Sequence, residues 1–191
     1  MTESKSPEHV AWEIRLGRLA EIARAWQRRM AEEPSKPERG SPLAGDDAGF
    51  NELSVSNLAS YSMATSTEPL DFCLSMMAKT QTMFPSAYLT VLRTALLTAS
   101  HAAWILAPKS RQGRQMNALR LTADDVRSQV AMVRTAYVSD ASVGKAKDAE
   151  LLRLTRHQAR LQEIADALGL KSDVTKPLVN NTAIIEEVAR T

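Results

Sequence analysis

Two segments in the second half of the chain carry matching apolar repeats, and this feature limits the possible folds most strongly. In the first segment, apolar residues recur at alternating steps of three and four: Met116, Leu119, Ala123, Val126, Val130, Val133 and Tyr137. The second segment continues the pattern with Leu151, Leu154, Gln158, Leu161, Ala165 and Leu168. A seven-residue apolar repeat places its members along one side of a helix. Because only a short loop (SDASVGK) separates the two segments, we predict an antiparallel helical hairpin.

The composition indicates that the rest of the chain is helical as well. The 191 residues suffice for a buried core, and 44% hydrophobic with 24% charged residues excludes general disorder. Seven Gly and eight Pro are too few for a β sandwich with many turns, and aromatic residues make up only 5%. The fold class predicted is therefore all-α, a helical bundle with a long antiparallel hairpin and an N-terminal helical arm.

The arm covers residues 1–31. Ser6 is a suitable N-cap and Pro7 a suitable first helical residue. One apolar stripe follows, formed by Trp12, Leu16, Leu19, Ala23, Trp26 and Met30. Two tryptophans on one stripe predict that the helix docks on a protein surface: its own domain, a second copy, or a partner protein of the host or a phage. We take Trp12, Leu16 and Trp26 as candidate partner-contact residues.

The domain boundaries follow from Pro and Gly content. Residues 32–49 (EEPSKPERGSPLAGDDAG) hold three Pro and three Gly without an apolar period, and are predicted to form a flexible linker. Residues 50–191 are predicted to form the helical bundle domain. Within it we expect a helix break at Pro69, because the residue before proline is driven out of the helical region.

The most hydrophobic segment directly follows Pro85 and ends before Pro108. Its 22 residues are long enough to span a bilayer, but Arg93, His101 and five Ser or Thr residues favour the central helix of a bundle. We interpret Arg93 and His101 as a structural polar pair, with Asp71 or Glu68 as the partner of Arg93. The last predicted helix starts near Thr182 and has only about ten residues, which is marginal for a helix standing alone. Whether the chain is a shortened member of a longer family stays open.

Few residues suggest chemistry. The three histidines form no metal-binding motif, and the single cysteine, Cys73, excludes an intramolecular disulfide. The sequence contains no nucleotide-binding or hydrolase signature. We therefore predict no catalytic residue, no metal and no cofactor.

The positive charge is concentrated in one segment. The formal net charge of the chain is +2, yet residues 109–160 carry eleven basic and five acidic groups. Arg153, Arg156 and Arg160 lie along one helical stripe beside His157. Such a stripe either binds phosphates or is a solvated helix face, and both interpretations remain open.

Residues 161–180 contain a pattern similar to a helix-turn-helix core, with Leu168-Gly169 at the tight turn. Two departures weaken the pattern. Pro177 lies where the recognition helix should continue, and Lys176 occupies a position that is usually apolar. A DNA-binding regulator is accordingly one alternative function.

The stretch PSAYLTVLRTALLTASHAAWILAPKSRQGRQMNALRLTADDVR, residues 85–127, resembles helical proteins of actinobacteria and their phages. Their build is similar to HEPN-type helical domains, some of which are ribonucleases in toxin or phage-defence systems. The resemblance covers residues 85–188 and implies a fold more than an activity. The HEPN catalytic pattern, Arg followed after four to six residues by His, is absent: seven residues separate Arg93 from His101, and three separate Arg153 from His157.

Three hypotheses about function result. The first is a non-enzymatic helical protein that acts through protein contacts, self-associates through its helices, and works in a phage or host-defence setting. The second is a HEPN-like ribonuclease using Arg93, His101 and His157, with His as general acid or base. The third is the DNA-binding regulator. Because the first residues, MTESKSPEH, contain no apolar signal core, we expect a cytoplasmic protein and no membrane partner.

Overall fold

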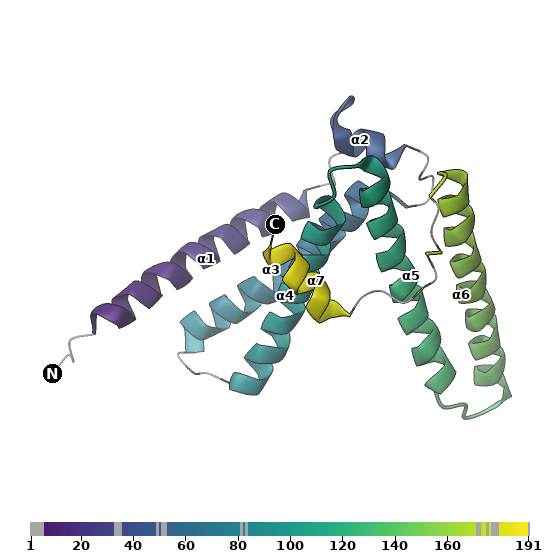
Figure 1. Cartoon of the computed structure of the whole chain (residues 1–191). Coiled ribbons are helices and arrows are strands. Elements are labelled where there is room, and N and C mark those ends of the chain that lie inside the picture. The colour runs from purple at the N-terminus through teal and green to yellow at the C-terminus, as the bar shows by residue number, and fades with distance from the viewer. Residues whose placement is uncertain are drawn as a thin grey trace. The chain divides into compact units, whose positions relative to one another are not determined.

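A computed structural model describes residues 6–32, 36–48, 50, 53–80, 82, 84–170, 173–174, 176 and 180–190 (Figure 1). The regular elements of these residues are all α-helices, which confirms the predicted all-α class. In chain order they are α1 (Pro7–Ala31), α2 (Pro42–Asp47), α3 (Val55–Thr80), α4 (Pro85–Leu106), α5 (Arg111–Thr135), α6 (Ala141–Ala167) and α7 (Asn181–Ala189).

The chain divides into two compact units. The first comprises Met1–Lys36 and Asn57–Ala103, and the second comprises Pro37–Ser56 and Trp104–Thr191. This division differs from the prediction of one domain over residues 50–191. Arg24 of α1 pairs with Asp71 of α3 in the first unit, whereas α2 packs against α5 in the second.

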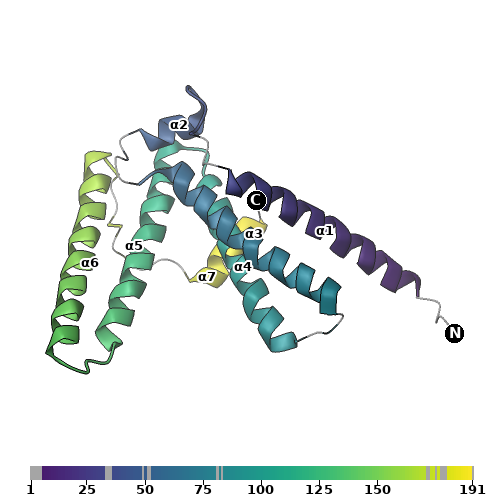
Figure 2. The same ribbon diagram turned by 180° about the vertical axis from the view of Figure 1, so that it is seen from behind.

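The hairpin of the second unit has the predicted form: α5 and α6 lie side by side and are joined at one end (Figures 1 and 2). Its core consists of seam residues from both helices, namely Leu119, Ala123, Val126, Leu154, Leu161 and Ala165, which are all buried. The repeat ends sooner than predicted. Tyr137 lies beyond the end of α5 and is 86% exposed.

Local hydrogen bonds define both ends of α6. Asp140 is the N-cap, and its Oδ1 accepts from the backbone N–H groups of Ser142 (2.8 Å) and Val143 (3.1 Å). The predicted loop SDASVGK is therefore helical from Ala141 onward. At the other end Gly169 has a φ of 67°, and the N–H of Leu170 donates to the carbonyl of Ala165 (2.9 Å). This is a Schellman motif, in which Gly169 follows the C-cap residue Leu168 and adopts the left-handed conformation.

In the first unit, α3 lies beside α4 (Figures 1 and 2), and α1 contacts α3 through its C-terminal half. Ala23 is buried, and Arg24 Nε lies 3.6 Å from a carboxylate oxygen of Asp71. Ser6 caps α1 as predicted, since its hydroxyl accepts from the N–H of His9 (3.2 Å). Every residue from Ser6 to Leu19 is exposed. Helix α1 thus contacts its own unit only through its C-terminal half.

The predicted helix break at Pro69 is wrong, because α3 continues through it. Proline cannot donate to the carbonyl four residues earlier, which normally weakens a helix. The preceding turn has additional hydrogen bonds from side chains: Ser66 Oγ donates to the carbonyl of Met63 (2.7 Å), and Thr67 Oγ1 to that of Ala64 (3.1 Å). Both hydroxyl residues are buried. Tertiary packing thus overrides the local preference.

Helix α4 is less covered than predicted. It is the one helix among the described residues that is long and apolar enough to cross a membrane by length and composition, and 28% of its most apolar window is buried. Tyr88, Ala95 and Ala102 face the packed side, while Leu89 and Leu96 are exposed. The prediction of a helix buried centrally is therefore wrong for the part in the first unit.

Part of the predicted flexible linker is helical. Pro42–Asp47 forms α2, with Ser41 as N-cap and Pro42 as first residue. The prediction of a linker rested on Pro and Gly content and on the lack of an apolar repeat. A helix of six residues is too short to show such a repeat, so the sequence contained no sign of it. Polar contacts from Arg114 and Gln115 of α5 to Asp46 hold the short helix in place.

Helix α7 docks on the second unit despite its length of nine residues. Ile184 is buried, and Trp104 Nε1 donates to Glu187 Oε2 at 3.2 Å. Trp104 also accepts through its carbonyl from Asn117 Nδ2 (2.8 Å). The packing partners of α7 are thus supplied by its own chain.

Candidate functional site

The residues of the HEPN-like hypothesis lie in different parts of the fold. Arg93 is exposed on α4, and His101 is half-buried on the same helix. His157 is half-buried on α6, in the other unit. The expected burial of Arg93 is wrong, because the side of α4 that carries it is uncovered. Asp71, one of its two predicted partners, instead forms the ion pair with Arg24.

The arginine stripe of α6 is exposed, and two of its members pair within the helix. Arg153 Nη2 lies 2.7 Å from Glu150 Oε1, and Arg160 Nη1 lies 2.9 Å from Glu163 Oε2. Hydrogen bonding to Arg153 lowers the pKa of Glu150, and the pKa of Arg153 is raised in turn. These carboxylates reduce the positive field of the stripe, a property typical of a solvated helix face.

The helix-turn-helix pattern is described only in part. The first helix and tight turn correspond to the end of α6 and its Schellman motif. Ser172, Thr175 and Pro177, which bear on the start of the recognition helix, lie outside the described residues. Among the described residues the next helix is α7, which begins at Asn181. The DNA-binding hypothesis stays a prediction.

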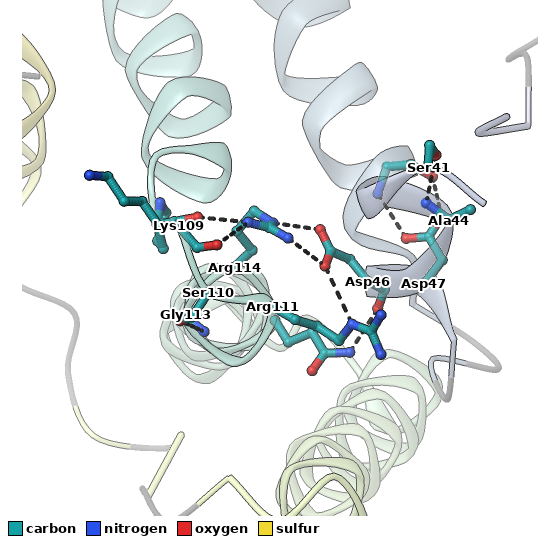
Figure 3. Close-up of polar contacts among 12 residues, drawn as sticks. Ser41, Ala44, Asp46, Asp47, Lys109, Ser110, Arg111, Gly113 and Arg114 are labelled. Atoms are coloured by element: carbon teal, nitrogen blue, oxygen red, sulfur yellow. Dashed lines mark hydrogen bonds and ion pairs between the residues drawn. The ribbon is translucent and has the colours of Figure 1, made fainter. Parts of the chain in front are cut away.

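The second unit contains a polar cluster that the sequence did not reveal, centred on Asp46 of α2 (Figure 3). The side chain of Asp46 is 1% exposed, and Arg114 binds it with two nitrogens: Nε to Oδ2 at 2.5 Å and Nη2 to Oδ1 at 2.8 Å. Arg111 Nε lies 3.9 Å from Oδ1. Gln115 Nε2 donates to the carbonyl of Asp46 at 2.8 Å.

The remaining donors of Arg114 are also used. Its Nη1 donates to the carbonyls of Pro108 (2.8 Å) and Lys109 (3.1 Å), just before α5. The hydrogen bonds that Arg114 donates to Asp46 raise the pKa of Arg114, so the guanidinium stays charged. Gly45 also fits this arrangement, because a Cβ atom there would collide with the Arg111 guanidinium.

The cluster acts as a structural clamp between α2 and the start of α5. Both oxygens of Asp46 accept from Arg114, so the buried carboxylate is matched by a positive charge from the same unit. Among the described residues, no group of three or more His, Cys, Asp or Glu side chains is placed to hold a metal ion. Asp47, the residue after Asp46, holds the start of α3. Its carboxylate accepts hydrogen bonds from the backbone N–H (3.1 Å) and the hydroxyl (2.6 Å) of Ser56.

The sequence signal for this clamp was weak. Asp46 lies in a stretch rich in Gly and Pro, and its partner is 68 residues away in the chain. One local feature indicated the position of Arg114. It follows the N-cap residue Ser110 by one turn, which places its guanidinium near the start of α5.

The three predicted partner-contact residues, in contrast, lie together on one helix and are all exposed: Trp12, Leu16 and Trp26. Leu19 and Ile22 extend the same surface. We call these five residues the arm stripe, and their exposed fractions range from 37% to 58%. The guanidinium carbon of Arg15 lies 5.3 Å from the Trp12 ring centre, and that of Arg29 lies 5.7 Å from the Trp26 ring centre.

No protein-family model matches this chain, and no match was found among curated proteins or solved structures. The class of protein is therefore defined by its fold and its exposed surfaces alone. The class is that of an all-α protein with a clamped helical hairpin and an exposed apolar arm.

Proposed function

We propose that this protein acts through protein–protein contacts and self-associates through α1. The observation that carries the proposal is the exposure of the arm stripe. Five large apolar side chains on one helix remain in water, although α1 is anchored to α3 by Ala23 and Arg24. Isolated exposed apolar residues are ordinary, but a contiguous set that includes two tryptophans is typical of an interaction site.

The energetics favour coverage of this stripe. Burial of apolar surface contributes about 25 cal/mol per Å², and tryptophans are the residue type most enriched among interface residues that dominate binding. Arg15 and Arg29 lie over the indole rings, so their side chains cover part of the aromatic surface while the charged groups retain water. Arginine and tryptophan together are the residue types enriched among the side chains that dominate binding at interfaces.

Sedimentation velocity over a wide concentration range tests the proposal. The wild-type chain is expected to form a dimer, and a Trp12→Ser/Trp26→Ser double variant to dissociate at a concentration at least about tenfold higher. Tyr137→Ser is the matched control, since Tyr137 is more exposed than either tryptophan but lies at the hairpin turn. A wild-type chain that stays monomeric at every concentration contradicts the proposal.

A further inference from the structure

The arm stripe has a symmetric spacing about its central residue. Relative to Leu19, Leu16 and Ile22 lie three residues to either side, and Trp12 and Trp26 lie seven residues to either side. At 100° per residue, the five side chains fall within an arc of about 120° on the helix surface. Reversing the direction of the helix therefore exchanges tryptophan with tryptophan and leucine with isoleucine.

The contact of α1 with its own unit involves the C-terminal half of the helix and leaves the five residues of the arm stripe exposed. The buried residue is Ala23, and Ala20, Gln27 and Met30 are half-buried. On a helical projection Ala23 and Met30 fall within the arc on its Leu16 side, while Ala20 and Gln27 lie beyond that edge. A second helix can cover the arm stripe from the side of Ile22 and Trp26 while α1 stays anchored to α3.

The charges of α1 change sign along its length. In the stretch from Pro7 to Ile14 the acidic residues are Glu8 and Glu13, with no Lys or Arg. In the stretch from Ile22 to Ala31 the charged residues are Arg24, Arg28 and Arg29. Two copies in parallel would place like charges together at both ends, whereas two antiparallel copies place opposite charges together at both ends.

We propose that the occupant of the arm stripe is α1 of a second copy of this chain, packed antiparallel with Leu19 on the two-fold axis. The inference rests on the proposed self-association and adds its geometry. Trp12 of one protomer packs near Trp26 of the other, and Glu8 lies near the other protomer's Arg29. Such an interface uses the same patch on both protomers, so it closes at the dimer.

Thiol cross-linking of the full chain tests this register. Single cysteines replace Leu19, Trp12 or Trp26, and a short bifunctional thiol reagent is added. Leu19→Cys is expected to cross-link with itself, while Trp12→Cys and Trp26→Cys each stay uncross-linked alone but join when mixed. In the antiparallel pair two Trp12 positions lie about 21 Å apart, beyond the reach of the reagent.

Two controls belong to this experiment. Val10→Cys places an exposed thiol on the opposite side of α1 and is expected to give no cross-link. The wild-type chain carries only Cys73, which is buried and whose pKa is raised by that burial, so it is expected to be unreactive while folded.

Charge exchange gives an independent measurement. Glu8→Arg or Arg29→Glu alone is expected to weaken the dimer roughly fivefold at low salt, and the double exchange is expected to restore it. A structural role of either residue within its own chain would show no such restoration. Circular dichroism verifies that each variant keeps its helix content.

The outcomes separate the inference from the proposed function. A dimer in which Trp12→Cys cross-links with itself, or in which no cysteine pair cross-links, overturns the antiparallel arm but leaves self-association intact. A monomer at all concentrations overturns both. A monomer that nevertheless binds vesicles of anionic phospholipid through α1 also overturns both, and shows that the stripe faces a membrane surface.

Discussion

Asp46 shows how one side chain determines the position of an element. Its carboxylate is removed from water, which is unfavourable unless the charge is matched, and Arg114 supplies the match with two parallel hydrogen bonds. A short helix with little apolar surface is thereby held at the start of α5. The pair determines where α2 lies more than it adds net stability.

Replacing Asp46 by Ala leaves a guanidinium that is 14% exposed without its partner. We expect the free energy of unfolding to fall by about 3 kcal/mol, the low end for a broken buried pair because Arg114 can still reach water. Urea unfolding measures the change. The matched control is Glu163→Ala, which removes the exposed partner of Arg160 and should cost at most about 1 kcal/mol. Equal losses in the two variants would contradict the clamp.

Asp140 provides a pH-dependent contribution at the hairpin turn. Hydrogen bonds, first from Ser142 and then from the backbone of Val143, lower the pKa of Asp140 from its ordinary 3.8 to about 2. Because the folded pKa lies below the ordinary value, the ionised cap stabilises α6 above pH 3.8, and this contribution is lost as the pH falls through about 2. Carboxyl-carbon NMR titration should give the lowered midpoint, and a Ser142→Ala variant should raise it. A midpoint near 3.8 in the wild-type chain would refute the cap.

The elements differ in how far the sequence predicted them. The hairpin was predictable because its core residues recur at every third or fourth position, and periodicity is a local signal. The buried residues Leu119, Leu154 and Leu161 were all members of the predicted seams. Continuity through Pro69 was not predictable, since it depends on buried hydroxyls and on packing against α4.

The candidate interaction surface was predicted in part. The stripe with Trp12, Leu16 and Trp26 followed from spacing, but its exposure depends on which face of α1 meets α3, and that choice is tertiary. The clamp at Asp46 could not be predicted for a different reason. Its two halves are far apart in sequence, and a carboxylate in a loop-like stretch gives no sign that it will be buried.

At the scale of an element, Gly169 controls how α6 ends. Its φ of 67° is unfavourable for any residue with a Cβ atom, so Gly169→Ala should destabilise the hairpin by about 1–2 kcal/mol. Gly17→Ala is the matched control. Gly17 lies within α1 with open space around it, so alanine there should be neutral or stabilising by up to about 1 kcal/mol. Thermal unfolding followed by circular dichroism compares the two, and a loss of stability in both would rule out the backbone explanation.

At the scale of the whole molecule, each unit is assembled from two separate stretches of chain. The second unit needs Pro37–Ser56 as well as Trp104–Thr191. Cutting out the hairpin therefore removes the partner of Arg114, even though α5 and α6 remain complete.

A fragment of residues 104–191 is consequently expected to bind a synthetic peptide of residues 37–56 and to gain helix content and thermal stability on binding. A peptide with Asp46→Ala should bind at least roughly tenfold more weakly, because it cannot neutralise Arg114. Isothermal titration calorimetry compares the two peptides. Equal affinities would show that the ion pair does not hold α2 in place.

The separation between Asp46 and Arg114 also has a consequence in time. At ribosomal rates of about 5–20 residues per second, adding the 68 residues from Asp47 to Arg114 takes roughly 3–14 seconds. During that interval α2 has no partner, and a nascent helix of six residues does not persist in water. The ion pair therefore forms only after the beginning of α5 has left the ribosome. Slowing elongation across residues 47–113 would prolong the time during which an unpaired Asp46 is exposed to other binding partners of the nascent chain.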